Sequence, residues 1–337
     1  MRINVIGGGL FGCTAAIKAA RAGHDVHLYE IKSELMSGAT ASTFARLHRG
    51  AHYPRDAATG RESRAAEASF RDEYGSCVID GGNQFYMVPI DEQNKVTADQ
   101  FEAFLDREQF AFERRGQIFQ VSEPRVNLAG LQALVRQKIA QSGVTVHLEE
   151  RGWVGGSATI IATYAGLNDY SGPQNYKFQL VERPLVLLPE KFANTSIVVI
   201  DGPYGCLDPL DHTPLHILGH VTASIHCETV GLRPAIPHYL RDYVDAGLIR
   251  SPKYTYFNDI VSGLARYVPG VEKAQHIGSS YVIRAVLSGV SDTDKRPTIV
   301  TDYGANVFSI FSGKLGTACQ AAEQVLRMIH QPDEVMA

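Results

Sequence analysis

The chain opens with a short apolar stretch, an alanine-rich stretch and a second stretch of strand character. Residues 3–6 form a short apolar run that is typical of a buried parallel strand. The alanine-rich segment 14–22 predicts a helix, and Gly23 is placed to end it. A second strand is expected at 25–29, so the chain begins with a predicted strand–helix–strand unit.

Further along, the pattern changes from helical to strand-like periodicity. Segment 127–142 carries apolar residues at helical spacing, and Asn127 is a suitable N-cap. Two strands are predicted to follow, at 144–150 and 157–166. Strand-like runs separated by turn residues come next, at 176–189, 195–203 and 216–227. We expect these runs to form a largely antiparallel sheet.

The last part of the chain returns to helical and strand patterns. A short amphipathic helix is predicted at 257–267, ended by Pro269 and Gly270. A strand and turn at 307–313 precede a final helix at 314–329. The sequence therefore predicts an α/β fold, a Rossmann-type domain with an inserted β-rich domain built on an antiparallel sheet. The predicted boundaries assign 1–80, 125–170 and 278–337 to the first domain, and 81–124 and 171–277 to the second.

Three glycines separate the first strand from the first helix at the spacing G-x-G-x-x-G. Gly7 allows a tight turn, Gly9 lets the backbone approach a pyrophosphate, and Gly12 lets helix and strand pack closely. The helix N-terminus offers N–H groups and positive charge to phosphates. Glu30, at the end of the second strand, can accept hydrogen bonds from an adenosine ribose and disfavours NADP. FAD and NAD share this fingerprint, so the unit predicts a dinucleotide site of either kind.

Composition narrows the class of protein. The 337 residues are enough for two domains, and 45% of them are apolar. The net charge of −4 gives no basis for binding nucleic acid or an anionic membrane, and no segment has the length of a membrane span. Five cysteines without a C-x-x-C pair predict reduced thiols, and a strand that starts at residue 2 or 3 leaves no room for a signal peptide. We expect a cytoplasmic protein.

Three histidines raise the question of a metal site. His212, His216 and His220 are four residues apart, so they would share one face of a helix. Pro209, Pro214 and Gly219 interrupt that helix, and the flanking residues have strand character. We predict no metal site.

Segment 38–61, GATASTFARLHRGAHYPRDAATGR, is rich in small residues and lacks periodicity. It also contains an unusual density of histidine, arginine and tyrosine. A solvated basic loop is one interpretation. The other is a loop that lies along a bound cofactor, with His48 or His52 facing the reactive ring.

Taken in order, the glycine fingerprint, this loop, ATIIATYAG at 158–166 and SIFSGKLGT at 309–317 resemble the D-amino-acid-oxidase-like (DAO) superfamily of FAD-dependent oxidoreductases. The run HRGAHYP at 48–54 is most similar to the branch that includes L-2-hydroxyglutarate oxidases. There, a small-residue stretch leads to H-x-G, an aromatic pair and a proline.

The resemblance implies that FAD is the cofactor. Some members of the superfamily bind it covalently through a histidine, for which His48 is the candidate here, but we predict that FAD is bound without a covalent link. The fingerprint would hold the ADP half, residues 40–42 would contact the pyrophosphate or ribityl, and 46–48 would pass the isoalloxazine. Residues 312–314 would direct N–H groups and a helix dipole at flavin N1 and C2=O. The implied cofactor-binding residues are Gly7, Gly9, Leu10, Phe11, Gly12, Glu30, Thr40, Ala41, Ser42, Arg46, Leu47, His48, Ala162, Thr163, Gly166, Ser312, Gly313 and Lys314.

Three side chains are candidates for catalysis. His48 would face the reactive ring. Arg284, inside the apolar run YVIRAVL, would bind a substrate carboxylate, with Arg296 as a competing candidate. Tyr204, in the turn DGPYG, would reach the substrate face of the flavin; a plain turn is the alternative.

The predicted function is FAD-dependent oxidation of a CH–NH or CH–OH bond of a small carboxylate-bearing molecule, an amino or hydroxy acid, by hydride transfer to flavin N5. Two alternatives stay open at this point. One is a flavin-dependent sugar-nucleotide mutase similar to UDP-galactopyranose mutase. The other is a flavin-binding protein without catalytic activity, although a scaffold gains nothing from the polar residues around His48.

Overall fold

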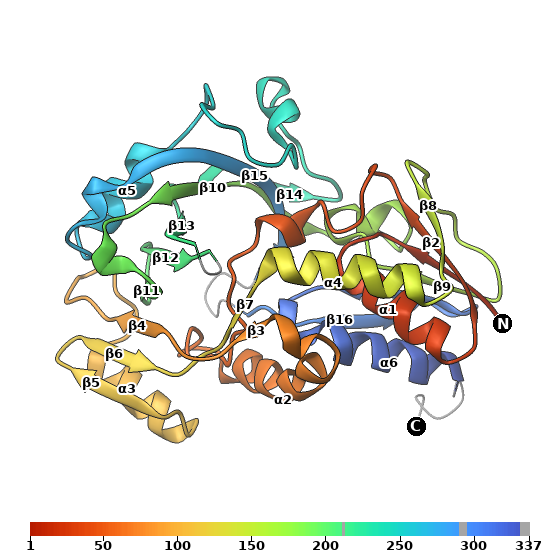
Figure 1. Cartoon of the computed structure of the whole chain (residues 1–337), viewed down its shortest axis with the longest axis horizontal. Coiled ribbons are helices and arrows are strands. Elements are labelled where there is room, and N and C mark those ends of the chain that lie inside the picture. Colours follow the sequence, from red (N-terminus) through yellow and green to blue (C-terminus); the bar gives the residue numbers. More distant parts are fainter. Residues whose placement is uncertain (211–212, 290–294, 331–337) are drawn as a thin grey trace.

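Two large β-sheets organise the chain (Figure 1). The structure is a computed structural model and describes residues 1–210, 213–289 and 295–330. Within these residues one sheet has six strands and the other has nine. The two sheets lie on opposite sides of Figure 1, and the segments between β2 and β4 and between β9 and β10 cross from one to the other.

The six-stranded sheet has the order β16-β17-β9-β1-β2-β8, and every neighbouring pair is parallel except β16 with β17. Its strands are β1 (Arg2–Ile6), β2 (Asp25–Glu30), β8 (Thr145–Leu148), β9 (Ala158–Ile161), β16 (Ile299–Asp302) and β17 (Val307–Phe311). Helices α1 (Leu10–Arg21), α4 (Leu128–Gln141) and α6 (Ala318–His330) share one hydrophobic core with it. The predicted strand–helix–strand opening is confirmed, with the helix starting at Leu10 instead of residue 14.

The nine-stranded sheet has the order β14-β10-β13-β12-β11-β4-β6-β5, with β15 also paired to β10. Its pairs are antiparallel except β4 with β11, which confirms the predicted sheet type. The strands are β4 (Asn83–Met87), β5 (Phe112–Arg115), β6 (Ile118–Val121), β10 (Tyr176–Leu187), β11 (Thr195–Val199), β12 (Gly205–Pro209), β13 (Leu215–His220), β14 (Ile225–Gly231) and β15 (Gln275–Leu287). Helices α3 (Ala98–Arg107) and α5 (Phe257–Ala265) cover parts of it.

Three boundaries differ from the predictions. The domain boundary at 278 falls inside β15, which pairs with β10 over its whole length. Helix α2 (Ala57–Tyr74) begins inside the segment that the sequence predicts to be a loop up to residue 61. The final helix begins at Ala318, after a 3₁₀ turn at Leu315–Thr317, because Lys314 has extended backbone. A minor two-stranded sheet joins β3 (Val78–Ile79) to β7 (Arg125–Val126).

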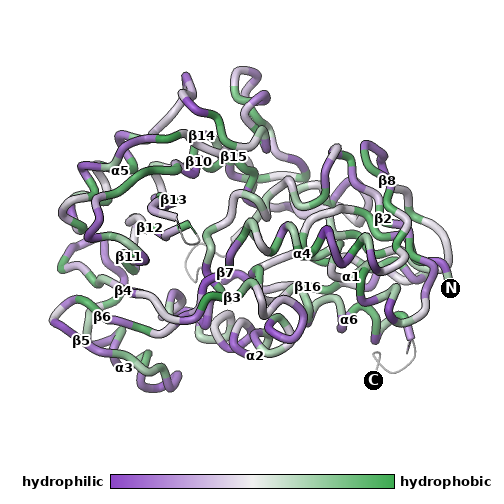
Figure 2. The backbone as a smooth tube through the Cα atoms, viewed as in Figure 1, coloured by the Kyte–Doolittle hydropathy of each residue, from purple (hydrophilic) through white to green (hydrophobic). Residues whose placement is uncertain are grey.

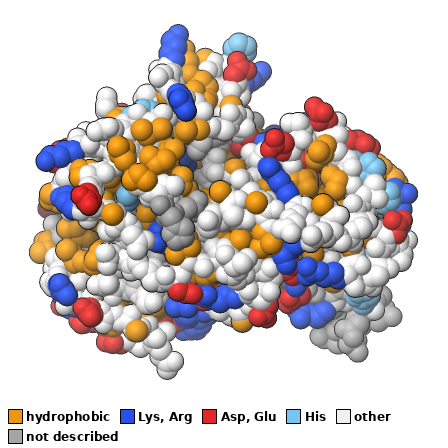
Figure 3. All heavy atoms as spheres, in the orientation of Figure 1, with side chains coloured by type: hydrophobic (Ala, Val, Ile, Leu, Met, Phe, Trp, Pro, Cys, Tyr) orange, Lys and Arg blue, Asp and Glu red, His pale blue; other side chains and the backbone are white. Residues whose placement is uncertain are grey.

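The surface carries no strong segregation of charge on the face that Figure 3 shows, where acidic and basic side chains are interspersed. Figure 2 shows hydrophobic stretches along α1 and hydrophilic ones along α2. No helix in the described part of the chain is both long and apolar enough to cross a membrane. All five cysteines are free thiols.

The close packing of Gly12 against Gly7 leads to a testable prediction. A Cβ atom at Gly12 would lie 1.8 Å from the carbonyl oxygen of Gly7, which is backbone and cannot move aside. Gly12→Ala should therefore lower the free energy of unfolding of the apoprotein by about 1–3 kcal/mol, measured by urea denaturation. The control is Gly75→Ala, because Gly75 has helical backbone and a Cβ atom there would have no neighbour within 4 Å. Equal stability of the two variants would contradict the packing role of Gly12.

Candidate functional site

The first cavity lies where β1, β2 and β9 end. Its volume is about 430 Å³, and the residues directly after these three strands line it. A crevice beyond the carboxyl ends of parallel strands is where α/β sheets bind dinucleotides. The lining includes the fingerprint loop, the end of β2, part of segment 37–43 and the turn after β9.

The glycines shape this cavity in two ways. Gly7 has φ +106°, and a Cβ there would lie 2.6 Å from the carbonyl oxygen of Ala162. At Gly9, by contrast, a Cβ would meet only the Thr40 hydroxyl, at 3.8 Å. Protein packing thus requires a glycine at position 7, whereas the bare backbone at Gly9 leaves room in the cavity itself. That is the cradle a pyrophosphate needs.

Electrostatics at this turn favours an anion. Gly9 is the N-cap of helix α1 and supplies no side-chain cap, and the first turn of the helix has no acidic residue. Leu10 N donates to Thr40 Oγ1 at 3.4 Å, and the positive end of the helix dipole lies at the cavity. The residues present fit the diphosphate of a dinucleotide.

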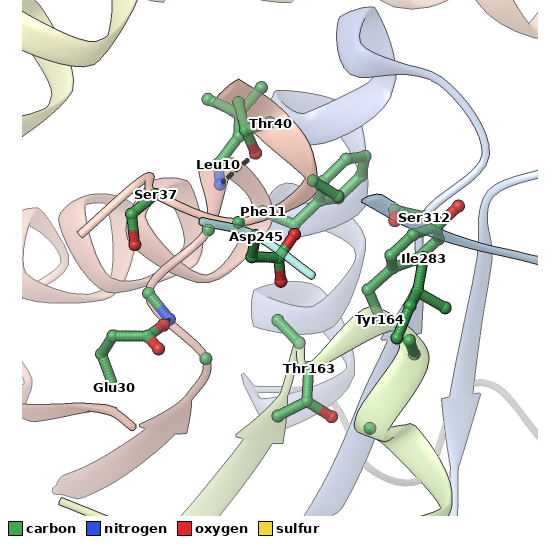
Figure 4. A pocket seen from close by; sticks show the side chains of 18 of the residues that line it. Leu10, Phe11, Glu30, Ser37, Thr40, Thr163, Tyr164, Asp245, Ile283 and Ser312 are labelled. Carbon is green, nitrogen blue, oxygen red and sulfur yellow. Dashed lines mark hydrogen bonds between the residues drawn. The ribbon is translucent and has the colours of Figure 1, made fainter. Parts of the chain in front are cut away.

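Glu30, at the end of β2, is hydrogen-bonded to the glycine turn. Its Oε2 accepts a hydrogen bond from Gly8 N at 2.6 Å, and its Oε1 accepts one from Lys32 N at 2.9 Å. Figure 4 shows Glu30 at the edge of the cavity, away from Tyr164 and Ser312. The carboxylate is held by backbone and can accept further hydrogen bonds, as a ribose would require.

A second cavity, of about 530 Å³, adjoins the first. The two cavities have part of their lining in common. The shared residues are Thr43, Tyr164, Arg183, Arg284, Ser312, Gly313, Lys314 and Leu315. The rest of the second cavity comes from the nine-stranded sheet and from the polar loop 43–55.

Basic side chains dominate the second cavity. The acidic residue in its described lining is Asp201, which pairs with Arg55. The basic residues are Arg46, Arg55, Lys95, Arg183, Arg284, Lys295, Arg296 and Lys314. Such a lining attracts anionic ligands.

Two arginines stand on one face of the sheet where the cavities meet. Arg284 is opposite Gln179 in the β10–β15 register, and Arg183 lies four residues further along β10, so both point to the same side. Arg284 Nε donates to Gln179 Oε1 at 2.9 Å. The Arg183 guanidinium stacks on Phe44 at 4.5 Å, and its buried Nε has no hydrogen-bond partner. Burial, and then the charge of Arg284, lowers the pKa of Arg183 to about 10.

His48 and His52 line the second cavity together. Their ring centroids are 5.6 Å apart, and the Nδ1 atom of each is buried without a hydrogen-bond partner. Burial lowers the pKa of both rings well below 6.5; the next cause is Lys314 for His48 and Arg46 for His52. Both rings are therefore neutral at pH 7 and keep a free nitrogen.

Lys314 lines both cavities, and the second of them also contains the two histidines. Its ammonium sits over the Tyr53 ring at 4.1 Å. Burial, and then the charge of Arg46, lowers the pKa of Lys314 to about 7. The predicted donor role of its neighbour Gly313 is limited, since Gly313 N already donates to Thr298 Oγ1 at 3.0 Å. The helix dipole expected here is also displaced, because α6 starts only at Ala318.

The predicted site residues separate into three groups. Those that line the first cavity are Gly7, Gly9, Leu10, Phe11, Glu30, Thr40, Ser42, Ala162, Thr163, Gly166, Ser312, Gly313 and Lys314. Those in the second cavity are Arg46, His48, Tyr204 and Arg284, together with Arg296. The remaining three face elsewhere: Gly12 packs on Gly7, Leu47 is buried in the core of the first sheet, and Ala41 is exposed.

The sequence analysis did not select two residues that line both cavities, Tyr164 and Arg183. Tyr164 anchors its ring there by donating to the Ala285 carbonyl and accepting from Ala285 N, both at 3.1 Å. Arg183 lies in the apolar run 176–189, so the reasoning that selected Arg284 applies to it equally. The adjacent Glu182 disguises that signal, because an acid next to an arginine resembles a surface pair.

The histidine triplet does not form a helix face. His216 and His220 lie on β13, as the strand character of their neighbours predicts, and His212 is outside the described residues. His216 Nε2 is within 2.9 Å of the Phe192 carbonyl, and His220 Nδ1 accepts from Ala223 N at 3.1 Å.

Comparison with known proteins agrees with this geometry. Residues 2–160 match the DAO family model, described as FAD dependent oxidoreductase. The FAD-dependent monooxygenase kojA of Aspergillus flavus is 25% identical, over 98% of this chain and 86% of the relative.

Two solved structures have the same fold. Glycine oxidase from Geobacillus kaustophilus has a TM-score of 0.70 at 14% identity, covering 99% of this chain and 96% of its own. L-amino acid deaminase from Proteus vulgaris has a TM-score of 0.73 at 9% identity, covering 100% and 95%. The dinucleotide cradle with its adjoining cavity thus defines an FAD-dependent oxidoreductase. Within that class, residues 2–160 are similar to the DAO family.

The charge of Lys314 makes a prediction about pH. Because the pKa of Lys314 in the folded protein is about 7, the side chain is charged below that pH and neutral above it. Binding of oxalate to the FAD-loaded protein, followed by the change in flavin absorbance, should therefore weaken about tenfold as pH rises through 7, the worth of one charged hydrogen bond.

Two variants check the assignment of this pH dependence. Lys314→Met should bind oxalate weakly at every pH. Lys95→Met, which changes an exposed lysine of the same cavity, should keep the wild-type pH profile. A pH profile that survives in Lys314→Met would assign the dependence to another group.

Proposed function

We propose that the protein oxidises the CH–OH bond of a small 2-hydroxy acid to the 2-oxo acid, with FAD as the hydride acceptor. The observation that carries the proposal is the presence, in one cavity next to the cofactor site, of two neighbouring arginines and two uncharged histidines. The arginines supply charge for a carboxylate, and the histidines supply an acceptor for a hydroxyl proton.

Arg284 and Arg183 are the carboxylate-binding pair. Both lie where the cavities join, which is where the reacting carbon must stand to reach the cofactor. A carboxylate taken out of water needs such a partner, because an unpaired buried charge costs several kcal/mol. The partly buried guanidinium of Arg183, with its orphan Nε, gains a hydrogen bond at the same time.

His48 is the proton acceptor in this account. Oxidation of an alcohol releases the hydroxyl proton as well as a hydride, so a base must take the proton. The ammonium group of an amino acid must also lose a proton, but it can do so to solvent before it binds, whereas an alcohol hydroxyl is too weak an acid for that and needs a base within the site. The neutral His48 ring, with an unpartnered Nδ1 in the cavity, therefore favours an alcohol over an amine.

FAD, when bound, supplies the hydride acceptor. The chain's own residues do the rest: Arg284 and Arg183 orient the substrate, His48 takes the proton, and the walls formed by Tyr164 and Phe44 exclude water. The similarity of the loop 48–54 to L-2-hydroxyglutarate oxidases makes that compound one member of the substrate series to be tested.

Anaerobic mixing with matched acids tests the proposal. We expect 2-hydroxy acids such as lactate, glycolate and L-2-hydroxyglutarate to include one that bleaches the flavin absorbance, whereas alanine, glycine and glutamate leave it unchanged. His48→Ala should slow bleaching at least about 100-fold, the usual contribution of a general base. Since the His48 pKa is lowered, the wild-type rate at saturating substrate should stay constant from about pH 8 down to the ordinary histidine pKa of about 6.5 and fall only in more acidic solution.

The matched control is His220→Ala. His220 lines the same cavity, but its Nδ1 already accepts backbone hydrogen bonds, so it cannot act as the base. Its bleaching rate should stay within about threefold of wild type. Bleaching by an amino acid alone, with no effect of His48→Ala, would refute oxidation of an alcohol.

The arginine assignment predicts a loss of affinity. Arg284→Lys keeps the charge and removes the planar fork, so the apparent affinity for the substrate identified above should fall at least about tenfold, worth about 1.4 kcal/mol. Arg296→Lys is the comparison, since Arg296 is the competing candidate from the sequence. A larger loss of affinity for Arg296→Lys than for Arg284→Lys would mean that Arg296 binds the substrate carboxylate.

A further inference from the structure

The segment between β14 and α5, residues 232–256, runs from the nine-stranded sheet to the first cavity. Backbone hydrogen bonds fasten it along β15: Asp245 N donates to the Tyr281 carbonyl at 2.8 Å, and Ile249 exchanges two bonds of 2.9 Å with Ser279. Tyr281 OH also donates to the Tyr254 carbonyl at 2.6 Å. The segment is therefore held in place by contacts at Asp245 and beyond it.

Asp245 brings a carboxylate into the cavity that the glycine turn forms. It lines that cavity together with the fingerprint loop, and Figure 4 shows its carboxylate among the lining side chains, in the space between Thr40 and Thr163. Its left-handed backbone, φ +54°, is one that aspartate tolerates better than most residues. No sequence motif of the glycine fingerprint includes this residue.

The two oxygens of Asp245 have different surroundings. Oδ2 accepts from Lys32 Nζ at 2.7 Å, and Lys32 lies two residues after the end of β2 in the six-stranded sheet. This ion pair therefore connects the two sheets across the cavity. Oδ1 is buried and has no hydrogen-bond partner in the described structure.

An unpartnered buried carboxylate oxygen is costly, so a ligand that donates a hydrogen bond to it gains affinity. A phosphate cannot do so, because its oxygens are acceptors and its charge repels a carboxylate. The donors that FAD carries between its phosphates and its rings are the hydroxyl groups of the ribityl chain and the ribose. These are the groups that suit Asp245.

We propose that Asp245 and Lys32 form a clasp that retains FAD, in which Asp245 Oδ1 accepts a hydrogen bond from a hydroxyl group of the cofactor. The clasp joins Asp245, in segment 232–256 after β14 of the nine-stranded sheet, to Lys32, which follows β2 of the six-stranded sheet. FAD cannot leave the first cavity past this point without breaking the ion pair. Both side chains are partly exposed, at 33% for Lys32 and 23% for Asp245, so salt weakens the pair.

The test is the rate at which FAD leaves the holoprotein, followed by the rise in flavin fluorescence after dilution. Asp245→Ala should release FAD about tenfold faster, and Asp245→Asn, which keeps an acceptor oxygen, should lie between it and wild type. Lys32→Met should accelerate release by a smaller factor. The double variant should match Asp245→Ala, because Lys32 acts only through Asp245. Added salt should speed release from wild type and leave Lys32→Met unaffected.

The matched control is Lys18→Met, which breaks an ion pair of 2.9 Å with Glu323 between α1 and α6, outside the cavity. Its release rate should equal that of wild type. Thermal unfolding of the apoproteins should also be the same for wild type and Asp245→Asn. Three results would overturn the clasp: unchanged release from both Asp245 variants, slower release from Asp245→Asn, or a loss of apoprotein stability large enough to account for the faster release.

Discussion

The geometry of the second cavity depends on one buried ion pair. Arg46 Nε donates to Asp208 Oδ1 at 2.5 Å, both side chains are almost fully buried, and Ser196 Oγ donates to the same oxygen at 2.5 Å. Arg46 belongs to the polar loop and Asp208 to β12, so the pair anchors the loop on the nine-stranded sheet. Removing one partner of such a pair leaves an uncompensated buried charge, which costs about 3–5 kcal/mol. The loop positions of His48 and His52 follow from this anchor together with two further contacts of the loop, the bond from Leu47 N to the Pro124 carbonyl and the bonds from Arg49 N and Gly50 N to Glu123 Oε1.

That anchor also explains the electrostatic character of the site. The Arg46 charge is one of the causes that lower the pKa of His48, His52 and Lys314, and burial is the largest cause for each. The cavity is therefore built from cations and from bases held neutral. An anionic ligand relieves the repulsion among these groups, so the same arrangement that destabilises the free cavity favours binding of an acid.

Sequence patterns predicted the nucleotide-binding half well. The glycine spacing, the alanine-rich helix and Glu30 are local signals, and each has the position that its chemistry requires. The antiparallel type of the second sheet was predicted correctly, but the end of its domain was not. Strand β15 pairs with β10, which lies about a hundred residues earlier in the chain, and only tertiary contacts reveal that pairing. Asp245 escaped for the same reason, because its partner Lys32 is distant in sequence, whereas Arg183 has a local signal that the adjacent Glu182 obscures. Leu47 lies one residue from His48, yet it turns into the core because backbone pairing with Pro124 fixes the loop.

The central claim is that the two cavities form one site, with the flavin ring at their shared wall and the substrate beyond it. A crystal structure of the FAD-loaded protein tests it most directly. We expect density for the isoalloxazine against Tyr164, Arg284 and Lys314, with its open face toward His48. Density that places the ring outside these shared residues, with the second cavity separated from it by protein, would contradict the account.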